Sequence, residues 1–175
     1  YKKNINLIIL LFSPDVSINK YCSSDEEKSC VRKALFEGEE WLMGDAGIIS
    51  DKDKFEKTKH KVPEKYHKAL KNCADHFDIC FDPLEGANEF CDYLKNKGYG
   101  IYILSNASDR FYEYFQRWKP LDYFTGYVVS CDIHILKPDE KIYKYLLNKY
   151  NLKAEECLFI DDVEKNIEGD RKSVV

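Results

Sequence analysis

The sequence predicts an α/β fold in which helices cover both faces of a parallel, doubly wound sheet. Two observations carry this prediction. After Pro83, apolar runs of strand length alternate with segments whose apolar residues recur at helical spacing. Near the start of the chain, residues 5–12 form an apolar run typical of a parallel strand buried on both faces. The chain has 175 residues, 44% of them hydrophobic, which is enough for one sizeable core.

The apolar run at residues 5–12 has a second reading. Lys2 and Lys3 precede it, so the segment looks like a short charged-then-apolar leader. The run is too short to span a membrane, and no small-residue cleavage site comes after it. We therefore predict a buried strand.

Residues 15–82 are predicted to form a helical insert. The segment is rich in charged and aromatic residues, its apolar residues fall at helical spacing, as Val31 and Leu35 do, and it contains no clear strand. The predicted organisation is thus an α/β core from residues 1–14 and 83–175, with a helical cap from residues 15–82. Within the cap, Trp41, Leu42 and Met43 are candidates to face a substrate.

The predicted elements of the core come in order after Pro83. The first is a helix from residue 87 that ends at Gly98, whose lack of a side chain suits a helix stop. Strands are predicted at residues 99–104, 127–133 and 158–160. Each is followed by a helix, the first through Phe111 and Phe115, the second starting at residues 136–140 with Pro138 in its first turn, and the third over residues 163–168.

Polar side chains follow three of the predicted strands. Ser105 and Asn106 end the first, Lys137 lies beyond the second, and Asp161 and Asp162 follow the third. The carboxyl ends of parallel strands meet at one edge of a sheet, where ligands bind. Hydrogen-bond donors, a fixed cation and a carboxylate able to hold Mg²⁺ are the groups that a phosphoryl group requires. Each residue alone has a commoner structural reading, such as a helix cap, so the joint placement carries the prediction.

The three segments resemble motifs of the haloacid dehalogenase-like hydrolase superfamily, in its magnesium-dependent phosphatase branch with a helical cap. Ile-Leu-Ser-Asn-Ala-Ser at 103–108 resembles the second motif, Leu-Lys-Pro-Asp at 136–139 the third, and Phe-Ile-Asp-Asp at 159–162 with Asn166 the fourth. The resemblance implies that Ser105 binds the phosphoryl group, that Lys137 steadies it and the nucleophile, and that Asp162 holds Mg²⁺ with Asp161 beside the metal. Asn106, next to Ser105, is a further candidate to bind the substrate. Ser105, Lys137 and Asp162 are the catalytic residues it implies, converging on one cleft.

The first motif departs from the family pattern. Members carry a nucleophilic aspartate at the end of the first strand, and here no acid precedes Asp15. Residues 3–5 resemble the start of that strand, while residues 6–15 resemble the segment that lies after the nucleophile. We therefore expect a missing segment, with a chain break between Ile5 and Asn6. In a continuous chain, Asp15 would be the one acid near the first strand, and it is a poor candidate for the nucleophile.

Three functions are consistent with these residues. The first is a magnesium-dependent phosphatase that acts on a small phosphorylated metabolite through a phosphoaspartate, with sugar phosphates as the family-level expectation. The second is a catalytically inactive member that binds phosphorylated ligands or a partner protein. The third is a metal-free haloacid dehalogenase, which we rank last because the paired acids at Asp161 and Asp162 suit Mg²⁺ better than a halide leaving group.

Charge and cysteine content narrow the expected partners. The 27 basic and 31 acidic residues are mixed along the chain and give a net charge of −4, so neither nucleic acid nor an anionic membrane is an expected partner. The seven scattered cysteines contain no C-x-x-C pair and are expected to be reduced thiols of a cytoplasmic protein.

The alternating His76, Asp78, Cys80 and Asp82 suggest either a metal site or a polar hinge, and we favour the hinge. The sequence leaves the oligomeric state open.

Overall fold

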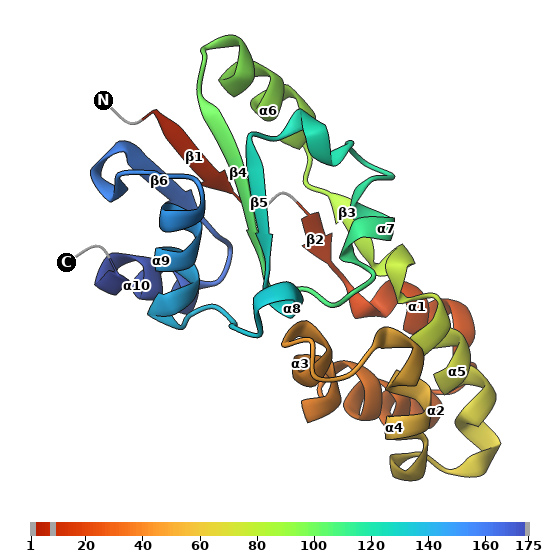
Figure 1. Cartoon of the computed structure of the whole chain (residues 1–175). Helices are drawn as coiled ribbons and strands as arrows, with labels where there is room; N and C mark the ends of the chain where they lie inside the picture. The colour runs from red at the N-terminus through yellow and green to blue at the C-terminus, as the bar shows by residue number, and fades with distance from the viewer. Residues whose placement is uncertain (1–2, 8–9, 174–175) are drawn as a thin grey trace.

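A parallel sheet forms the centre of the core, as Figure 1 shows in the computed structural model, which describes residues 3–7 and 10–173. In the described chain this sheet has four strands in the order β5-β4-β1-β6. Their bounds are Asn4–Leu7 for β1, Gly100–Ser105 for β4, Gly126–Val129 for β5 and Cys157–Ile160 for β6. The predicted α/β fold class with a parallel sheet is confirmed.

Both faces of this sheet are covered by helices, because strand residues alternate between the two faces. On β4, Ile101 and Ile103 join a core cluster with residues of α6 (Ala87–Asn96) and α7 (Phe111–Phe115). Tyr102 and Leu104 join a separate cluster with residues of α9 (Glu140–Lys149). The last helix, α10 (Glu164–Ser173), packs against α9.

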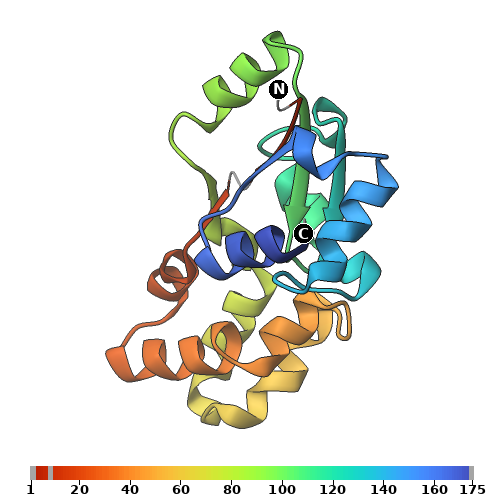
Figure 2. The ribbon, with the colours of Figure 1, turned by 90° about the vertical axis from the view of Figure 1, so that its left-hand side faces the viewer.

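A helical unit lies beyond the carboxyl ends of the sheet strands, as Figures 1 and 2 show from two directions. It is joined to the core through an antiparallel ribbon of β2 (Leu10–Phe12) and β3 (Phe81–Pro83). Its helices are α1 (Pro14–Tyr21), α2 (Asp25–Val31), α3 (Glu39–Asp45), α4 (Lys54–Thr58) and α5 (His67–Asp75).

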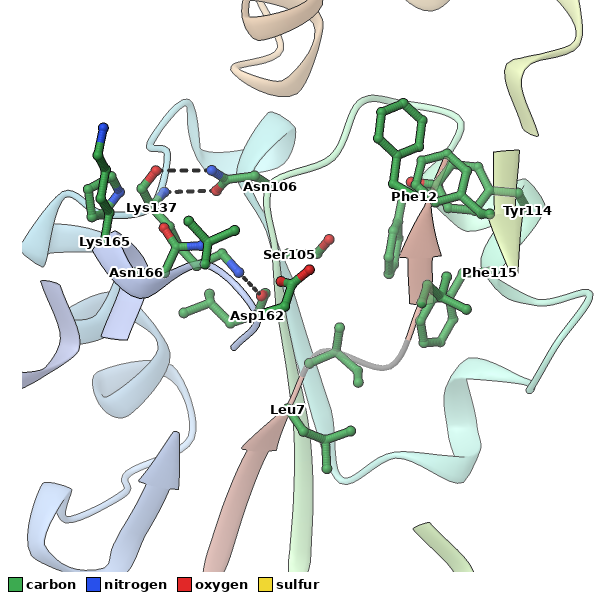
Figure 3. A pocket seen from close by; sticks show the side chains of 17 residues that line it. Leu7, Phe12, Ser105, Asn106, Tyr114, Phe115, Lys137, Asp162, Lys165 and Asn166 are labelled. Atoms are coloured by element: carbon green, nitrogen blue, oxygen red, sulfur yellow. Dashed lines mark hydrogen bonds between the residues drawn. The ribbon is translucent and has the colours of Figure 1, made fainter. Parts of the chain in front are cut away.

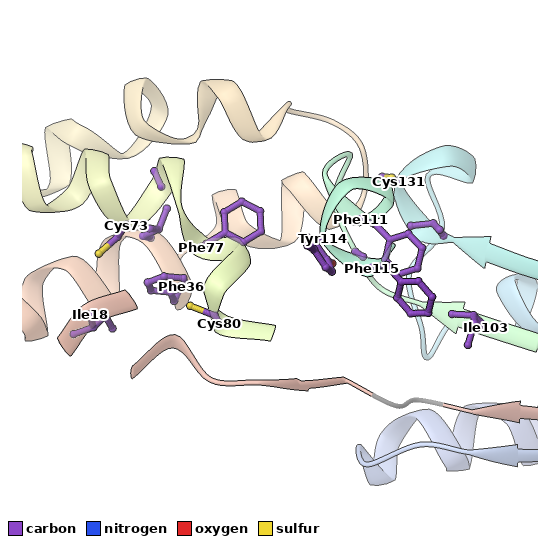
Figure 4. Packing of buried hydrophobic residues seen from close by; sticks show 14 of the residues in the cluster. Ile18, Phe36, Cys73, Phe77, Cys80, Ile103, Phe111, Tyr114, Phe115 and Cys131 are labelled. Carbon is purple, nitrogen blue, oxygen red and sulfur yellow. The ribbon is translucent and has the colours of Figure 1, made fainter. Parts of the chain in front are cut away.

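Aromatic and aliphatic packing connects the helical unit to the core. Buried residues of the two parts belong to one cluster, which extends from Ile18 and Phe77 to Phe111 and Ile103 (Figure 4). The ring centroid of Phe81 in the ribbon lies 4.1 Å from that of Tyr114 in α7. The cap therefore packs against the core through apolar and aromatic side chains.

Two predictions about the start of the chain are wrong. The apolar run at 5–12 is divided between β1 and β2, which belong to different sheets; the predicted strand's residues 8 and 9 lie outside the described residues. The expected break between Ile5 and Asn6 is absent, because β1 runs through both residues, pairing Ile5 with Ile101 and Asn6 with Tyr102. The insert also ends in a strand that was not predicted, β3.

Two predicted boundaries in the core are also wrong. The strand predicted over 127–133 ends at Val129 and is followed by the short helix α8 (Ser130–Ile133), where buried Ser130 Oγ accepts a hydrogen bond from the amide of Ala107. The helix predicted from residue 136 begins at Glu140, because the Asp139 side chain caps it by accepting a hydrogen bond from the amide of Lys141. Pro138, which follows a cis peptide bond, precedes this helix.

Two further observations concern the described residues as a whole. None of the helices within residues 3–7 and 10–173 is long and apolar enough to cross a membrane. The seven cysteines all lie within these residues and none forms a disulfide there; five of them are buried.

Candidate functional site

A cavity of about 510 Å³ opens at the carboxyl edge of the parallel sheet (Figure 3). Ser105 at the end of β4, Lys137 before α9 and Asp162 after β6 all line it. The predicted convergence of these three residues on one cleft is confirmed. They meet because parallel strands deliver their carboxyl ends to the same edge.

Lys137 is held rigidly at this edge. Its side chain is buried, and its Nζ donates to Asp161 Oδ2 at 2.7 Å and to the carbonyl oxygen of Leu104 at 2.9 Å. Burial lowers the pKa of Lys137 below its usual value, although the negative charge of Asp161 acts in the opposite direction. The ammonium group is thereby fixed at Leu104, the residue directly before Ser105.

Asp161 is engaged by the protein at both carboxylate oxygens. While Oδ2 accepts from Lys137, Oδ1 accepts from the amide of Val163 and from Nδ2 of Asn166, both at 2.9 Å. The resemblance placed Asp161 beside the metal. The geometry instead directs its carboxylate to Lys137 and to the first turn of α10.

Asn106 is likewise turned toward Lys137. Its Nδ2 donates to the carbonyl oxygen of Lys137 at 3.0 Å, and its Oδ1 accepts from the amide of Lys137 at 2.8 Å. Asn106 lines the cavity. Because both ends of its amide are used, its main structural effect is to join the end of β4 to the Lys137 backbone.

Asp162 offers the exposed carboxylate of the cavity. No group of three His, Cys, Asp or Glu side chains suited to a metal occurs within the part of the chain that the structure describes. Magnesium is usually bound through one or two carboxylates together with waters and substrate phosphates. The donor set therefore fits a Mg²⁺ ion shared with a bound phosphate, held from the protein side by Asp162.

The carboxyl end of β1 carries Leu7, which lines the cavity beside Ser105 and Asp162. Asp15, the first acid in the sequence, lies in α1 and pairs with Arg32. It is not among the residues that line the cavity. The described part of β1 thus presents an aliphatic side chain where the family pattern has its nucleophile.

A second group of charged residues joins the cap to the core, and sequence reasoning missed it. Lys54 is fully buried, with Nζ 2.7 Å from Asp51 Oδ1 and 3.8 Å from the centroid of the Trp41 ring. This contact between Lys54 and Asp51 is a buried ion pair. Asp51 Oδ2 accepts from Ser108 Oγ at 2.7 Å and from the amide of Arg110 at 3.3 Å. In the sequence, Lys54 stands in a charged stretch that looks like a solvated helix face.

The alternating residues at 76–82 form no metal site in the structure. Asp78 Oδ2 accepts from Arg117 at 2.7 Å, and Oδ1 accepts from Arg110 at 3.3 Å. Burial alone would raise the pKa of Asp78, but the hydrogen bond and charge of Arg117 lower it below the usual value. Asp78 thus ties the end of the cap to α7 and the segment after it, in agreement with the polar hinge that was favoured.

A parallel sheet with a helical cap and a serine, a lysine and an aspartate around one cavity at its carboxyl edge defines the class of capped α/β hydrolases. The chain belongs to the haloacid dehalogenase-like hydrolase family, whose model matches residues 14–169. A search of curated proteins finds no relative of similar sequence.

Solved structures of this family share the fold. One is a haloacid dehalogenase family enzyme from Bacteroides thetaiotaomicron, an aspartate-to-alanine mutant in complex with magnesium and inorganic phosphate; it has a TM-score of 0.75 at 18% identity and covers 100% of this chain and 92% of its own. A predicted hydrolase of the same family from Porphyromonas gingivalis has a TM-score of 0.67 at 20% identity, and the match covers 99% of this chain and 88% of the other. L-2-haloacid dehalogenase from Xanthobacter autotrophicus, with chloropropionic acid covalently bound, has a TM-score of 0.66 at 15% identity, covering 99% and 75%.

Proposed function

We propose that the cavity binds the phosphoryl group of a small phosphate monoester together with Mg²⁺, as the site of a magnesium-dependent phosphatase does. The observation that carries this proposal is the fixed Lys137 ammonium, held between Asp161 and Leu104 in the cavity that Ser105 and Asp162 also line. The Bacteroides enzyme, which shares the fold, was crystallised with magnesium and inorganic phosphate.

Each residue has a distinct part in this binding. The Ser105 hydroxyl donates a hydrogen bond to a phosphoryl oxygen, and Lys137 supplies a positive charge that Asp161 keeps in place. Asp162 is the carboxylate that would hold Mg²⁺. When bound, the ion neutralises charge on the phosphoryl oxygens.

The end of β1 favours a second candidate function, which is binding without hydrolysis. Hydrolysis through a phosphoaspartate requires a carboxylate at this position, and Leu7 lines the cavity there. The sequence continues through Ile8 and Ile9 to Leu10 without an acid. The same observation weighs against the dehalogenase reading, since that branch also begins with an aspartate after its first strand.

The test uses the full chain after its intact mass has been confirmed. Binding of inorganic phosphate is measured by calorimetry with Mg²⁺ and with chelator, and hydrolysis of p-nitrophenyl phosphate is followed under the same conditions. We expect phosphate binding that Mg²⁺ strengthens, and we expect Asp162→Asn to remove this strengthening. Asp122→Asn is the matched control, because Asp122 is exposed and does not line the cavity.

The outcomes separate the candidates. Phosphate release that stops on chelation would establish the phosphatase, whereas tight binding without release would establish the binding protein. A chain that binds no phosphate in any condition contradicts the proposal. Hydrolysis that survives both chelator and Asp162→Ala would remove Mg²⁺ from the mechanism.

A further inference from the structure

We propose that the ligand of this cavity is the phosphate monoester of an aromatic alcohol, not that of a sugar. The inference rests on the proposed function and concerns the ester substituent, the part of the ligand that is attached to the phosphoryl group. It derives from the division of the cavity into two sides of different chemistry.

Figure 3 shows this division directly. Lys137, Lys165 and Asn166 lie on one side, Phe12, Tyr114 and Phe115 lie on the other, and Ser105 and Asp162 lie between them. The ester substituent of a phosphoryl group bound at Ser105 and Lys137 can therefore point either to the charged side or to the aromatic side. The path away from the charged groups leads to the aromatic rings.

The aromatic side is built of rings that contact one another, some stacked and others tilted or edge-on. The ring centroids of Phe12 and Phe81 are 4.8 Å apart, and those of Phe81 and Tyr114 are 4.1 Å apart with an interplanar angle of only 4°. Phe111 and Phe115, whose centroids are 4.7 Å apart, also line the cavity. Phe111, Tyr114 and Phe115 are themselves buried, so the ring surface available to a further aromatic ring comes mainly from the half-buried Phe12 and Phe81.

Sugar hydroxyls would find few partners on this side. Of the aromatic side chains that line the cavity within the described residues, Tyr114 alone carries a polar group, and Leu7 and Leu10 add aliphatic surface. A hydroxyl buried there without a hydrogen bond would weaken binding, whereas an aryl ring gains from leaving water. Burial raises the pKa of Tyr114 well above its usual value, so its hydroxyl stays neutral and able to donate one hydrogen bond.

The volume of the cavity agrees with a ligand of this size. At about 510 Å³, it lies within the range of roughly 300–1,000 Å³ that is common for small-molecule sites. One or two fused rings and a phosphate group fit within such a volume.

The experiment compares ligands that share the phosphate and differ in the substituent. Calorimetry with Mg²⁺ measures the affinity of the full chain for inorganic phosphate, phenyl phosphate, 2-naphthyl phosphate, glycerol phosphate and glucose 6-phosphate. We expect phenyl and 2-naphthyl phosphate to bind at least roughly tenfold more tightly than the two polyol phosphates, as apolar complementarity commonly provides.

Two neighbouring leucines of β2 supply a matched pair of variants. Leu10 lines the cavity, whereas Leu11 does not and is 51% exposed. Leu10→Gln should weaken the binding of phenyl phosphate about tenfold and leave inorganic phosphate unchanged, and Leu11→Gln should change neither. Leu10→Ala serves as a second variant if circular dichroism shows that the glutamine variant is not folded.

The failure of this inference is distinguishable from failure of the proposed function. Equal affinity for phenyl phosphate and glycerol phosphate would overturn the aromatic preference while the phosphate site stands. Weaker binding of both inorganic and phenyl phosphate to Leu10→Ala, by the same factor, would also overturn it. If no phosphate compound binds, the proposed function itself is wrong.

Discussion

At the scale of single residues, the adjacent acids Asp161 and Asp162 differ clearly in burial and in hydrogen bonding. Asp161 is 8% exposed and accepts three hydrogen bonds, including that from Lys137. Asp162 is exposed on the rim of the cavity. The sequence predicted both as metal-side acids, because a dipeptide carries no information about which carboxylate the fold turns inward.

This difference predicts that two matched substitutions change the free energy of unfolding by very different amounts. Asp161→Asn removes the charge partner of a buried lysine and should lower the free energy of unfolding by roughly 3 kcal/mol. Asp162→Asn should change it by less than about 0.5 kcal/mol, since the side chain is exposed. Urea denaturation measures both, and equal losses of stability would contradict the assignment.

Asp45 gives the protein a pH-dependent stability. Burial raises the pKa of its carboxyl from 3.8 to about 7, with Lys54 opposing and Asp51 reinforcing the shift. Between these values the folded chain retains a proton that the unfolded chain has lost, so the free energy of unfolding falls as pH rises.

The expected result is that Asp45→Asn removes this part of the pH dependence. The asparagine variant should exceed the original chain in stability by at least about 1 kcal/mol at pH 8 and by less at pH 5. Urea midpoints at the two pH values provide the measurement. An identical change of stability with pH in both proteins would show that Asp45 does not hold the proton.

At the scale of helices and strands, the sequence predicted most of the core elements and misplaced several ends. Apolar periodicity identified α6, β4 and β6, whose bounds agree with the predictions within about two residues. The ends of β5 and α9 depended on single tertiary or capping contacts, at Ser130 and Asp139, that periodicity does not register. The sequence did not reveal that the apolar run near the N-terminus is divided between two sheets, because β1 and β2 both contribute apolar residues to it.

The cap at Asp139 can be tested alone. Asp139→Ala removes the side-chain acceptor for the Lys141 amide and should lower the free energy of unfolding by about 1 kcal/mol. Glu168→Ala is a suitable control, because Glu168 is an exposed acid within α10. Similar, small effects of both changes would contradict a stabilising cap.

At the scale of the whole molecule, the ribbon of β2 and β3, apolar packing and the ion pairs of Asp78 all hold the cap against the core. A further connection is the buried group in which Asp51 binds Ser108 while pairing with Lys54. The sequence predicted that Ser105, Lys137 and Asp162 would meet, since strand topology alone brings them together. It could not predict that Asp51 would meet Ser108, 57 residues away, because this contact depends on how the cap rests on the core.

A double-mutant cycle tests the ion pair inside this buried group, Asp51 with Lys54. Asp51→Leu leaves Lys54 buried without its charge partner, and Lys54→Met leaves Asp51 similarly unpaired, so each should cost roughly 3–5 kcal/mol. The double variant should cost clearly less than the sum of the two, because it leaves neither charge alone. Additive losses in urea denaturation would mean that the pair does not act as a unit.

The position of Trp41 should make its fluorescence sensitive to a ligand in the cavity. Its indole stacks on Phe12, with ring centroids 5.1 Å apart, and Phe12 also lines the cavity. The second tryptophan, Trp118, also contacts a residue that lines the cavity, Phe115, as well as Phe124. In a Trp118→Phe chain, the fluorescence emission would come from Trp41 alone. Phenyl phosphate in the cavity should then change its intensity or wavelength, whereas an unchanged spectrum at saturation would show that the indole does not sense the ligand through Phe12.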